Sequence, residues 1–590
     1  MTIDCRNLNT LWSSILVETF HRLGLTTAVI CPGSRSTPLT VAFARHQVIE
    51  AIPILDERSA AFFALGVAKR SGLPVVLVCT SGTAGANFYP AVIEAKESGV
   101  PLIILTADRP PQLRNCHAGQ TIDQLKLYGN YPNWQTELAL PEADLGMLRY
   151  LRQNIIHAWE RSLFPVQGVV HLNLPFQEPL APTPQPEIEV IQSQFPREDF
   201  FAHIPNHCSF PVSSSPFPLP LQQWQSSPKG IIIAGLAQPA NPEKYCRAIA
   251  YLAKTLQFPV LAEALSPIRN YADINPYLIS TYDCILRNER LASQLTPDVV
   301  IQVGELPTSK QLRNWLEPTQ CQRWIISPEP ENFDPLHGNS LHLRTSVEEL
   351  IERINAYRQT ETNSSNFSSD YLKQWCEADS QIRKAIDSTM ETLELLYDGK
   401  AAWLLSRCLP PQTPIFIANS MSVRNVEFFW QPNNSRVIPY FNRGANGIDG
   451  TLSTALGIAH RHQSAVMLTG DLALLHDTNG FLIGNKFQGH LTIILINNNG
   501  GGIFEALPIA QFDPPFEEFF ATPQQVNYDK LFAAYEVEYK LIDNWVWLEH
   551  LLNPLPTRGI RVLEIPTNRK TDTFWLQNNL SIFAQNIILS

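Results

Sequence analysis

Residues Gly470 to Gly502 read GDLALLHDTNGFLIGNKFQGHLTIILINNNGGG. Leu491 to Ile496 is a short apolar run rich in β-forming residues, which predicts a buried strand, and it ends abruptly in Asn and Gly residues. The apolar run Ala465 to Leu468 ends in the same way, about one helix of sequence earlier. This spacing predicts a βαβ unit with polar residues at the carboxyl ends of both strands, where open parallel sheets bind ligands.

The residue types at these strand ends predict a metal ion and a phosphate group. Asp471, the amide oxygen of Asn498 and the backbone carbonyl of Gly500 are hard oxygen donors, which Mg²⁺ binds together with phosphate oxygens and water. The neighbouring glycines permit close approach of the backbone to an anion. An ordinary turn of a Rossmann-like fold would contain similar residues, so the motif alone leaves both interpretations open.

The composition narrows the class of protein. A chain of 590 residues has room for about four domains. Its net charge of −11 argues against a non-specific nucleic-acid binder, so any anionic ligand needs a local cluster of Arg and Lys. The sequence shows no membrane span and no signal peptide. The ten cysteines are scattered without a CxxC, which favours reduced thiols, and we expect a soluble cytoplasmic protein.

Strand-like runs follow a helical segment at the start of the chain. Asn7 to Leu23 has helical periodicity. Four apolar runs come next, and each of them ends in small or polar residues: Thr27 to Cys31, Ile52 to Leu55, Val75 to Cys79 and Leu102 to Leu105. Because strands alternate with helices, we predict an α/β domain with a doubly wound parallel sheet and functional residues at its strand ends.

An internal repeat links the two ends of the chain. ALGVAKR at 64–70 resembles ALGIAHR at 455–461, displaced by about 390 residues, and a strand, a polar loop, a helix and a strand follow each copy. We interpret the copies as two related α/β domains. The alternative is a chance similarity between two βαβ units, since the match is short.

A third α/β pattern lies between the two copies, with strand-like runs at Gly230 to Gly235, Val260 to Ala262, Val299 to Val303 and Trp324 to Ser327. A Pro- and Ser-rich stretch, Leu174 to Gly230, precedes it and is expected to be extended and poorly packed. The polar stretch Gln359 to Ser369 follows it and is expected to be mobile. The sequence therefore predicts three doubly wound parallel-sheet domains, of which the central one is Rossmann-like, at 1–185, 229–355 and 371–590, joined by linkers at 186–228 and 356–370.

This layout resembles that of the thiamine diphosphate-dependent decarboxylase family, in which the outer domains are related. The spacing from Asp471 to Asn498 is similar to the family's diphosphate motif, although Leu472 stands where many members have Gly. The resemblance implies that the first domain binds the aminopyrimidine ring and that the third binds the diphosphate through Mg²⁺ or Mn²⁺. It also implies a homodimer or homotetramer with active sites shared between subunits.

Glu57, at the end of the second predicted strand, matches the family's essential glutamate. A carboxyl at that place shares a proton with the pyrimidine ring and so promotes deprotonation of the cofactor. For an isolated Asp-Glu-Arg, a solvated ion pair with Arg58 is the simpler explanation, but the motif at Asp471 favours the catalytic one. The resemblance implies further cofactor contacts at Thr80, Ser81, Gly82, Asn419, Ser420, Ile448, Leu472 and Ala473.

Four signatures resemble the MenD family in particular, the 2-succinyl-5-enolpyruvyl-6-hydroxy-3-cyclohexene-1-carboxylate synthases of menaquinone and phylloquinone biosynthesis. They are CPGSRSTP from Cys31, TADRPP from Thr106, NRGANGIDG from Asn442 and NNNGG from Asn497. The transferase reaction of that family decarboxylates 2-oxoglutarate and adds the resulting carbanion to isochorismate in a 1,4 sense. The alternatives are an acetohydroxyacid synthase type of enzyme, which would accept pyruvate, and a non-catalytic protein, which would be expected to lack Glu57 or Asp471.

Both substrates of this reaction are dicarboxylates, so the site needs several positive charges. Arginine suits carboxylates because its planar fork forms two parallel bonds, although a surface ion pair is the commoner role of any single arginine. Arg424 and Arg443 match the residues that bind the succinyl carboxylate, and those of the first and central domains match residues that face isochorismate. The substrate site implied by the resemblance comprises Ser34, Arg35, Arg109, Gln120, Lys310, Ser420, Arg424, Arg443, Ile503 and Phe504.

Three details of the sequence qualify this resemblance. Gly119 and Gln311 replace residues that could donate a hydrogen bond in some members, so substrate affinity could differ without a change of reaction. The aromatic segment from Phe512 to Pro523 is expected to cover the site or to be buried between subunits.

Overall fold

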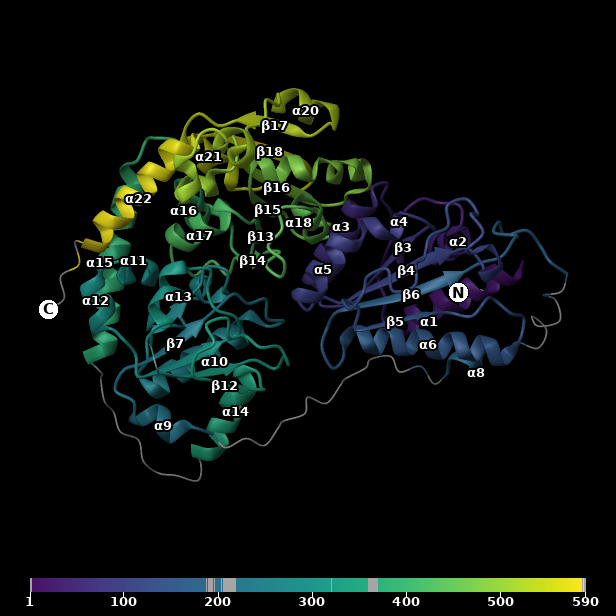
Figure 1. Cartoon of the computed structure of the whole chain (residues 1–590), viewed down its shortest axis with the longest axis horizontal. Helices are drawn as coiled ribbons and strands as arrows, with labels where there is room; N and C mark the ends of the chain where they lie inside the picture. The colour runs from purple at the N-terminus through teal and green to yellow at the C-terminus, as the bar shows by residue number, and fades with distance from the viewer. Residues whose placement is uncertain are drawn as a thin grey trace.

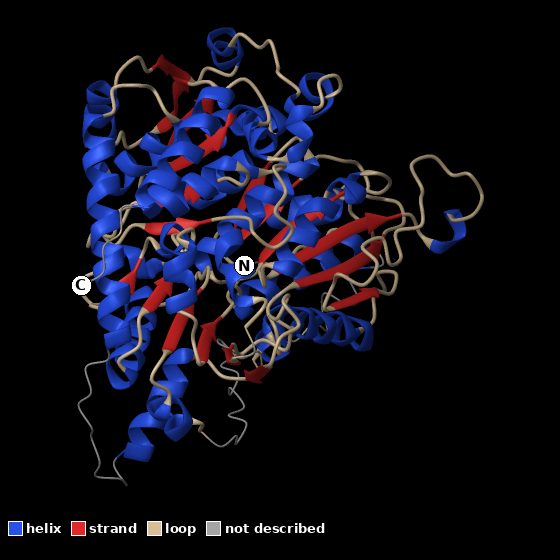
Figure 2. Cartoon of the chain, turned by 60° about the vertical axis from the view of Figure 1, so that its left-hand side comes forward, coloured by secondary structure: helices blue, strands red, loops and turns tan. Residues whose placement is uncertain are grey.

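A computed structural model of the chain describes residues 3–186, 188, 195, 197–202, 204, 219–319, 321–358, 370–585 and 587. Figure 1 shows three lobes: the amino-terminal lobe on the right, the central lobe at the lower left and the carboxy-terminal lobe at the upper left. Each lobe has one six-stranded parallel sheet, and helices cover the sheets on both sides (Figure 2). The predicted fold class is confirmed. None of the described helices is long and apolar enough to cross a membrane.

The sheet of the first lobe has the strand order β2-β1-β3-β4-β6-β5. Its strands are β1 Thr27–Ile30, β2 Glu50–Pro53, β3 Val75–Cys79, β4 Leu102–Asp108, β5 Trp134–Glu137 and β6 Val169–Pro175. Its helices are α1 Leu8–Leu23, α2 Thr37–Arg45, α3 Glu57–Ser71, α4 Ala84–Asn87, α5 Tyr89–Glu97, η1 Pro111–Leu113 and α6 Leu145–Leu163. Strands β1, β3, β4 and β6 are buried along their whole length because helices cover both faces, which explains why they read as continuous apolar runs.

The sheet of the third lobe has the order β14-β13-β15-β16-β18-β17. Its strands are β13 Pro414–Ile417, β14 Ile438–Tyr440, β15 Ala465–Gly470, β16 His490–Asn497, β17 Glu538–Leu541 and β18 Gly559–Pro566. Its helices are α15 Asp370–Thr392, α16 Asp398–Cys408, α17 Met421–Phe429, α18 Thr451–Ala459, α19 Asp471–His476, η3 Thr478–Lys486, η4 Gly502–Ala506, η5 Pro508–Gln511, η6 Glu517–Ala521, α20 Tyr528–Ala534, α21 Trp545–Leu552 and α22 Arg569–Gln585. Strand for strand, this order repeats that of the first lobe, so the short sequence repeat reflects a repeated fold.

The sheet of the central lobe has the order β12-β11-β10-β7-β8-β9, which is the 3-2-1-4-5-6 order of a Rossmann fold read from its other edge. Its strands are β7 Gly230–Ala234, β8 Val260–Ala262, β9 Leu278–Ile279, β10 Val299–Val303, β11 Gln322–Ile326 and β12 Ser340–Leu343. Its helices are α9 Leu221–Ser226, α10 Pro242–Leu256, η2 Pro267–Asn270, α11 Tyr282–Leu286, α12 Glu289–Gln294, α13 Lys310–Leu316 and α14 Val347–Arg358.

The Pro- and Ser-rich stretch differs from expectation where the structure describes it. Helix α8, Arg197–Phe201, and helix α9 interrupt the segment that was expected to be extended and poorly packed. Phe200 and Phe201 are buried in the core of the first lobe, and Trp224 is fully buried in that of the central lobe. The prediction failed because the apolar residues of this stretch, although sparse in sequence, pack into the cores of the first and central lobes. The polar stretch 359–369 lies outside the described residues.

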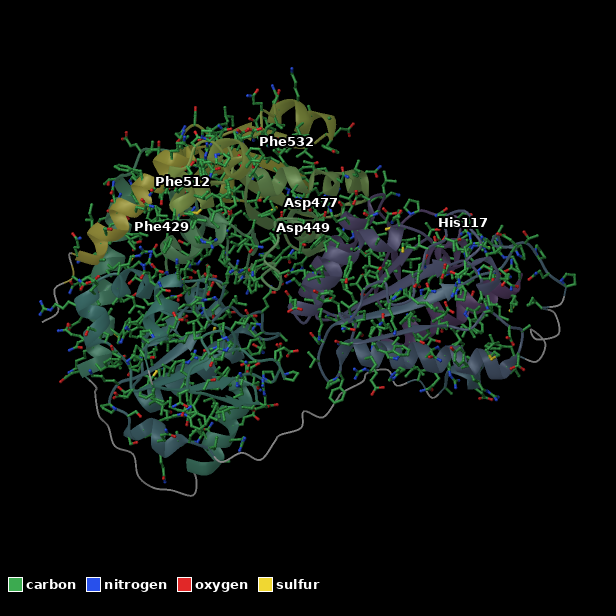
Figure 3. All side chains as sticks on the ribbon, viewed as in Figure 1. His117, Phe429, Asp449, Asp477, Phe512 and Phe532 are labelled. Carbon is green, nitrogen blue, oxygen red and sulfur yellow. The ribbon has the colours of Figure 1, made fainter. Side chains whose placement is uncertain are left out.

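The first and third lobes contact each other through helices α3 and α18, which lie side by side in Figure 1. Arg70 Nη1 donates to the carbonyl of His460 at 2.6 Å, and the buried carboxylate of Glu94 accepts from the backbone N–H groups of Gly444 and Ala445 at 3.1 and 2.7 Å. Asp477, labelled in Figure 3 at this junction, accepts from Ser59 Oγ of the first lobe at 3.4 Å and from Ser453 N–H of its own lobe at 2.7 Å. The contact therefore combines helix packing with buried polar bonds.

Candidate active site

A cavity of about 460 Å³ lies in the third lobe at the carboxyl ends of β13, β15 and β16. The ends of parallel strands meet at one edge of a sheet, so residues far apart in sequence come together there. Twelve of the predicted site residues line this cavity: Asn419, Ser420, Arg424, Arg443, Ile448, Asp471, Leu472, Ala473, Asn498, Gly500, Ile503 and Phe504.

Asp471 and Asn498 present oxygen atoms at the ends of β15 and β16. One carboxylate oxygen of Asp471 accepts from Leu472 N–H at 2.8 Å and the other from Gly500 N–H at 2.7 Å. Burial raises the pKa of Asp471 to about 6. The amide oxygen of Asn498 is buried and has no hydrogen-bond partner among the described residues. A buried carboxylate beside an unsatisfied amide oxygen fits a hard cation.

The loop that follows β16 requires glycine. Gly500 has φ +119°, and a Cβ at this residue would lie 2.2 Å from the carbonyl oxygen of Ala521. Within the described residues, no three His, Cys, Asp or Glu side chains gather as a metal cluster. A cation at this edge would therefore be held by a single carboxylate with amide and backbone oxygens, which leaves coordination positions for phosphate and water.

Two arginines share the same cavity. Arg424 Nη1 donates to the carbonyl of Ser420 at 2.6 Å, and Arg443 Nη1 donates to Asn419 Oδ1 at 3.0 Å. Neither guanidinium forms an ion pair with a carboxylate in the described part of the chain. Burial lowers the pKa of Arg424, and the nearby charge of Arg443 lowers it further. Two neighbouring guanidinium groups that contact no carboxylate among the described residues indicate an anion-binding site.

Ser420 has an unusual backbone conformation at the start of α17. Its φ of +67° and ψ of −127° are rarely adopted by residues other than glycine. Such strain persists where the surroundings fix it, and it is often found at binding sites. Here the conformation turns the chain from β13 into the helix that carries Arg424.

A second group of predicted residues lies together on the first lobe. Arg109 Nη1 donates to Ser81 Oγ at 2.8 Å, and Gln120 Nε2 donates to the carbonyl of Ser81 at 2.9 Å. Gly82 packs against Gln120, since a Cβ on Gly82 would lie 2.9 Å from the Gln120 side chain. This cluster occupies the ends of β3 and β4 and the loop that follows β4.

Arg35 joins this first-lobe group. Its backbone N–H donates to Thr80 Oγ1 at 3.2 Å, and its Nη1 donates to the carbonyl of Phe176 at 3.0 Å. Its Nε is buried without a partner among the described residues, and Glu178 lies 3.4 Å from Nη1. Burial lowers the pKa of Arg35, and the nearby charge of Arg109 lowers it further. Ser34, the preceding residue, is exposed.

Glu57 is the first residue of α3. Asp56 caps this helix by accepting from Ser59 N–H at 2.9 Å, and Asn479 Nδ2 of the third lobe donates to Asp56 at 2.8 Å. The Glu57 side chain is half-buried and has no hydrogen bond or ion pair to a described residue. Burial raises the pKa of the Cys79 thiol, and the charge of Glu57 raises it further, so this carboxylate lies near the end of β3.

The two groups do not form one site within a chain. All the described residues that line the third-lobe cavity lie between Asp398 and Phe504. In Figure 3, His117, from the loop that carries Gln120, and Phe512, from the segment after η4, lie on different lobes. Lys310 begins α13 on the central lobe, where it is exposed and does not line the cavity. The two groups of predicted residues therefore lie on separate lobes of one chain.

Sequence reasoning missed several polar residues at the cavity. Asp398 and Asn425 line it, and both are buried. Neither residue follows a predicted strand, so no signal in the sequence singled them out. Glu263 lies outside this lining and was also missed, although it directly follows the predicted strand Val260 to Ala262, so the rule of polar strand ends applies to it as well.

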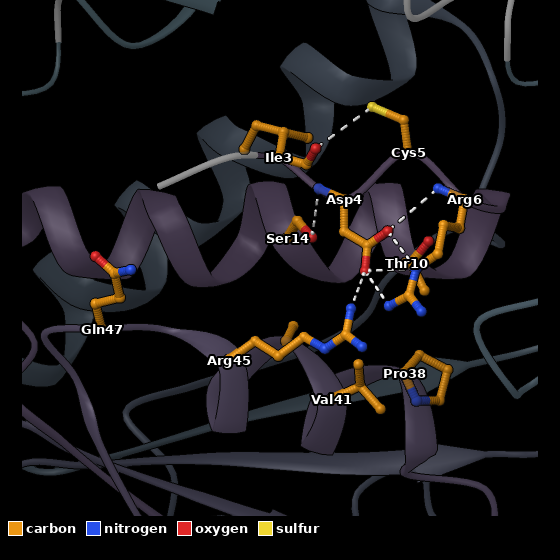
Figure 4. Close-up of a pocket in the computed structure, with 11 residues that line it drawn as sticks. Ile3, Asp4, Cys5, Arg6, Thr10, Ser14, Pro38, Val41, Arg45 and Gln47 are labelled. Carbon is orange, nitrogen blue, oxygen red and sulfur yellow. Dashed lines mark hydrogen bonds and ion pairs between the residues drawn. The ribbon is translucent and has the colours of Figure 1, made fainter.

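A hollow of about 680 Å³ lies beside the amino-terminal segment and α2 (Figure 4). Asp4 in this hollow is paired with Arg6 at 2.9 Å and with Arg45 at 3.3 Å. Both arginines of this hollow are thus paired with a carboxylate, unlike those of the third-lobe cavity. We therefore place the candidate active site in the third lobe and not here.

Comparison with known proteins agrees with this geometry. The family pattern "Thiamine pyrophosphate enzyme, N-terminal TPP binding domain" matches residues 12–127, and "Middle domain of thiamine pyrophosphate" matches residues 216–417. The chain is 68% identical to the 2-succinyl-5-enolpyruvyl-6-hydroxy-3-cyclohexene-1-carboxylate synthase of Gloeothece citriformis (strain PCC 7424), over 99% of this chain and all of the relative. This chain belongs to that synthase family.

Other matches support the same conclusion. The synthase of Nostoc sp. (strain PCC 7120 / SAG 25.82 / UTEX 2576) is 62% identical over the full length of both chains. The crystal structure of benzoylformate decarboxylase from Polynucleobacter necessarius has a TM-score of 0.67 at 18% identity and covers 95% of this chain and 98% of its own. That structural similarity shows a shared fold. The family assignment comes from the similarity to the MenD synthases.

Proposed function

We propose that this chain catalyses the reaction for which its relatives are named, by decarboxylating 2-oxoglutarate and adding the resulting carbanion to isochorismate. The observation that carries the proposal is the pair of arginines, Arg424 and Arg443, that share one cavity without a carboxylate partner. The second carboxylate of 2-oxoglutarate would supply the missing charge. Pyruvate has no group that could do so.

The described residues fit thiamine diphosphate with Mg²⁺ or Mn²⁺. Asp471, the unpartnered amide oxygen of Asn498 and the carbonyl of Gly500 would hold the metal ion. When bound, the cofactor supplies a nucleophilic carbon and an electron sink for the decarboxylation. The residues that would contact the rest of it are Glu57, Thr80, Ser81, Gly82, Asn419, Ser420, Ile448, Leu472 and Ala473.

The side chains of this protein would move one proton and orient two anions. Glu57 would hold a proton at the pyrimidine ring. Arg424 and Arg443 would bind the distal carboxylate of 2-oxoglutarate. The groups that would orient isochorismate, and so offset the repulsion between two dianions, are Ser34, Arg35, Arg109, Gln120 and Lys310. Ile503 and Phe504, which line the cavity, would exclude water from the reacting carbon.

We also propose that a second copy of the chain completes the site, in a homodimer or homotetramer. The support is the separation of the two half-sites: Glu57 and Arg109 lie on the first lobe, and the cavity is lined from the third. In this arrangement 1–185 would be the pyrimidine-binding domain and 371–590 the diphosphate-binding domain. The central domain at 229–355 would contribute Lys310.

An assay with alternative substrates tests the proposed function. The purified chain with thiamine diphosphate and Mg²⁺ is given 2-oxoglutarate, with or without isochorismate, and pyruvate replaces 2-oxoglutarate in a parallel reaction. We expect isochorismate to be consumed only when 2-oxoglutarate is present, with release of CO₂. Turnover of pyruvate while isochorismate is left intact would refute the substrate assignment and keep the cofactor assignment.

A further inference from the structure

Thr308 of the central lobe connects a buried carboxylate to Arg443. Arg443 Nη2 donates to Thr308 Oγ1 at 3.2 Å. Thr308 Oγ1 in turn donates to Glu263 Oε1 at 2.7 Å, and Thr308 N–H donates to Glu263 Oε2 at 2.6 Å. A hydroxyl group has one proton, so a Thr308 that donates to Glu263 can only accept from Arg443. The donor and the acceptor of each hydrogen bond from Arg443 through Thr308 to Glu263 are therefore fixed.

Glu263 is placed to orient Thr308 and has no access to solvent. It directly follows β8, its exposed fraction is 0%, and both of its oxygens are bonded to the same threonine. Thr308 lies in the loop after β10. The carboxyl-terminal edge of this Rossmann sheet, where such folds commonly bind nucleotides, here faces the arginine of the neighbouring lobe.

Asn419 holds the other terminal nitrogen of Arg443. Its amide nitrogen donates to the carbonyls of Asn442 and Gly447, both at 2.7 Å, which leaves Oδ1 to accept from Arg443 Nη1 at 3.0 Å. Both Nη atoms are thus fixed by uncharged oxygens. Nε of Arg443 is buried and has no partner among the described residues.

The threonine keeps the positive charge of Arg443 available. A direct ion pair with Glu263 would neutralise the guanidinium, whereas the interposed hydroxyl orients it without doing so. Burial lowers the pKa of Arg443, and the charge of Glu263 is the largest opposing cause. Glu263 therefore stabilises the charged form of Arg443 from beyond hydrogen-bonding distance.

The central lobe also fixes the position of α17, the helix that carries Arg424. Arg269, which is fully buried, donates from Nη2 to Glu427 Oε1 at 2.9 Å and from Nη1 to the Glu427 carbonyl at 2.8 Å. Ala264 N–H donates to the other carboxylate oxygen of Glu427 at 2.7 Å. Glu427 lies three residues after Arg424 on α17, so the central lobe contacts both arginine-bearing segments of the cavity.

We propose that Thr308 and Glu263 are positioning residues that orient Arg443 toward the distal carboxylate of the substrate and so favour dicarboxylic over monocarboxylic 2-oxo acids. The proposal rests on the proposed function, because it takes that carboxylate to be the ligand of Arg443. It gives the central lobe a role in substrate preference, exerted through a side chain of the third lobe.

Thr308→Val tests the proposal, since valine keeps the shape and removes the hydroxyl. We expect the KM for 2-oxoglutarate to rise roughly tenfold with a smaller change in kcat, the equivalent of one lost hydrogen bond to a charged group. The KM for isochorismate and the affinity for thiamine diphosphate should stay unchanged. Thr308→Ser should retain the wild-type KM for 2-oxoglutarate. Glu263→Gln should raise that KM, as Thr308→Val does.

Binding of glutarate provides a measurement that does not depend on turnover. Calorimetry on the cofactor-loaded protein should show glutarate binding about tenfold more weakly to Thr308→Val than to wild type, with butyrate unaffected. Thr319→Val is the matched control, because the bonds of Thr319 Oγ1 to described residues are local: to the carbonyl of Leu316 at 2.6 Å and to the Cys321 thiol at 3.2 Å. Unchanged thermal unfolding of both variants would show that each is folded.

The outcomes separate this proposal from the proposed function. Wild-type protein that neither turns over 2-oxoglutarate nor prefers glutarate to butyrate would refute both. Wild-type protein that does both, together with Thr308→Val and Glu263→Gln variants that match it in KM and in glutarate affinity, would refute the positioning role alone. A Thr308→Val variant that loses affinity for glutarate, butyrate and cofactor alike would also refute it, because general damage to the cavity would then explain the effect.

Discussion

Gly66 and Gly457 meet where α3 crosses α18. A Cβ on Gly66 would lie 2.1 Å from the carbonyl oxygen of Thr454, and a Cβ on Gly457 would lie 2.1 Å from that of Phe63. The two glycines hold equivalent positions in the repeated heptapeptides, and their contacts mirror each other. The sequence repeat is therefore also the contact between the first and third lobes, and α3 places Glu57 at its start.

Gly66→Ala should destabilise the protein by disrupting this crossing. The new methyl group cannot be accommodated unless the helices move apart, for which overpacking costs of about 1–3 kcal/mol are typical. Urea unfolding followed by tryptophan fluorescence should show a lower midpoint. Gly119→Ala is the control, since nothing lies within 4 Å of its Cβ position, and it should unfold like wild type. Equal midpoints for Gly66→Ala and Gly119→Ala would contradict the packing argument.

Mixing two inactive variants should restore activity if active sites are shared between chains. Glu57→Gln should abolish turnover and leave the cofactor bound, and Asp471→Ala should lose metal-dependent cofactor binding. In a mixed dimer one site carries both substitutions and the other carries neither, so equal mixing after subunit exchange should recover about one quarter of the sites. Activity that stays at the level of the separate variants would place each site within one chain.

Removal of the metal should release the cofactor from the wild-type protein. Calorimetry of thiamine diphosphate binding should give a strong signal with Mg²⁺ and little signal after treatment with EDTA, and added Mg²⁺ should restore it. Asn498→Ala should weaken metal-dependent binding, since it removes the buried amide oxygen that has no partner among the described residues. Cofactor affinity that is independent of both the metal and Asn498 would argue against this metal site.

Arg443→Gln should weaken the use of 2-oxoglutarate much more than the binding of the cofactor. Loss of charge-assisted bonds to a carboxylate corresponds to about 1.5–3 kcal/mol, or a rise in KM of roughly tenfold to more than a hundredfold. Arg407→Gln on the same lobe is the control, because Arg407 is exposed and lies outside the cavity, with Glu391 at 3.5 Å from its guanidinium. Steady-state kinetics with both variants checks this, and a KM for 2-oxoglutarate that Arg443→Gln leaves unchanged would remove Arg443 from the substrate site.

The ionisation of Asp572 and Asp398 should lower the free energy of unfolding as the pH rises. Both are buried, burial raises the pKa of each, and the charge of Asp398 raises the pKa of Asp572 further. A carboxyl whose pKa is higher in the folded state contributes stability below its unfolded pKa and loses that contribution as the pH passes its folded pKa.

Asp572→Asn removes this ionisation, so its thermal midpoint should fall less than that of wild type between about pH 5 and pH 8. Asp543→Asn, at an exposed position, should behave like wild type. Parallel pH profiles for wild type and Asp572→Asn would contradict the assignment.

The sequence by itself determined the fold class, the repeat and the chemistry of the strand ends. Val75–Cys79, Val260–Ala262 and Val299–Val303 are strands with the predicted bounds, because strands buried on both faces are uninterrupted apolar runs. The second strand was misplaced, since β2 is Glu50–Pro53 and the apolar Leu55 lies beyond it, 64% exposed. Asp471 and Asn498 were found because polar residues that follow such runs are visible in the sequence, and Arg443 was found through the resemblance to the MenD family.

Only the tertiary structure decided which of these residues meet. It placed Arg424 and Arg443 in one cavity, held Arg109 and Gln120 apart from them on another lobe, and brought Thr308 and Glu263 to Arg443. The physical reason is that a strand end is a local property of the chain. The partner of a strand end depends on the order of strands in the sheet and on how the lobes pack, and those are contacts between residues distant in sequence.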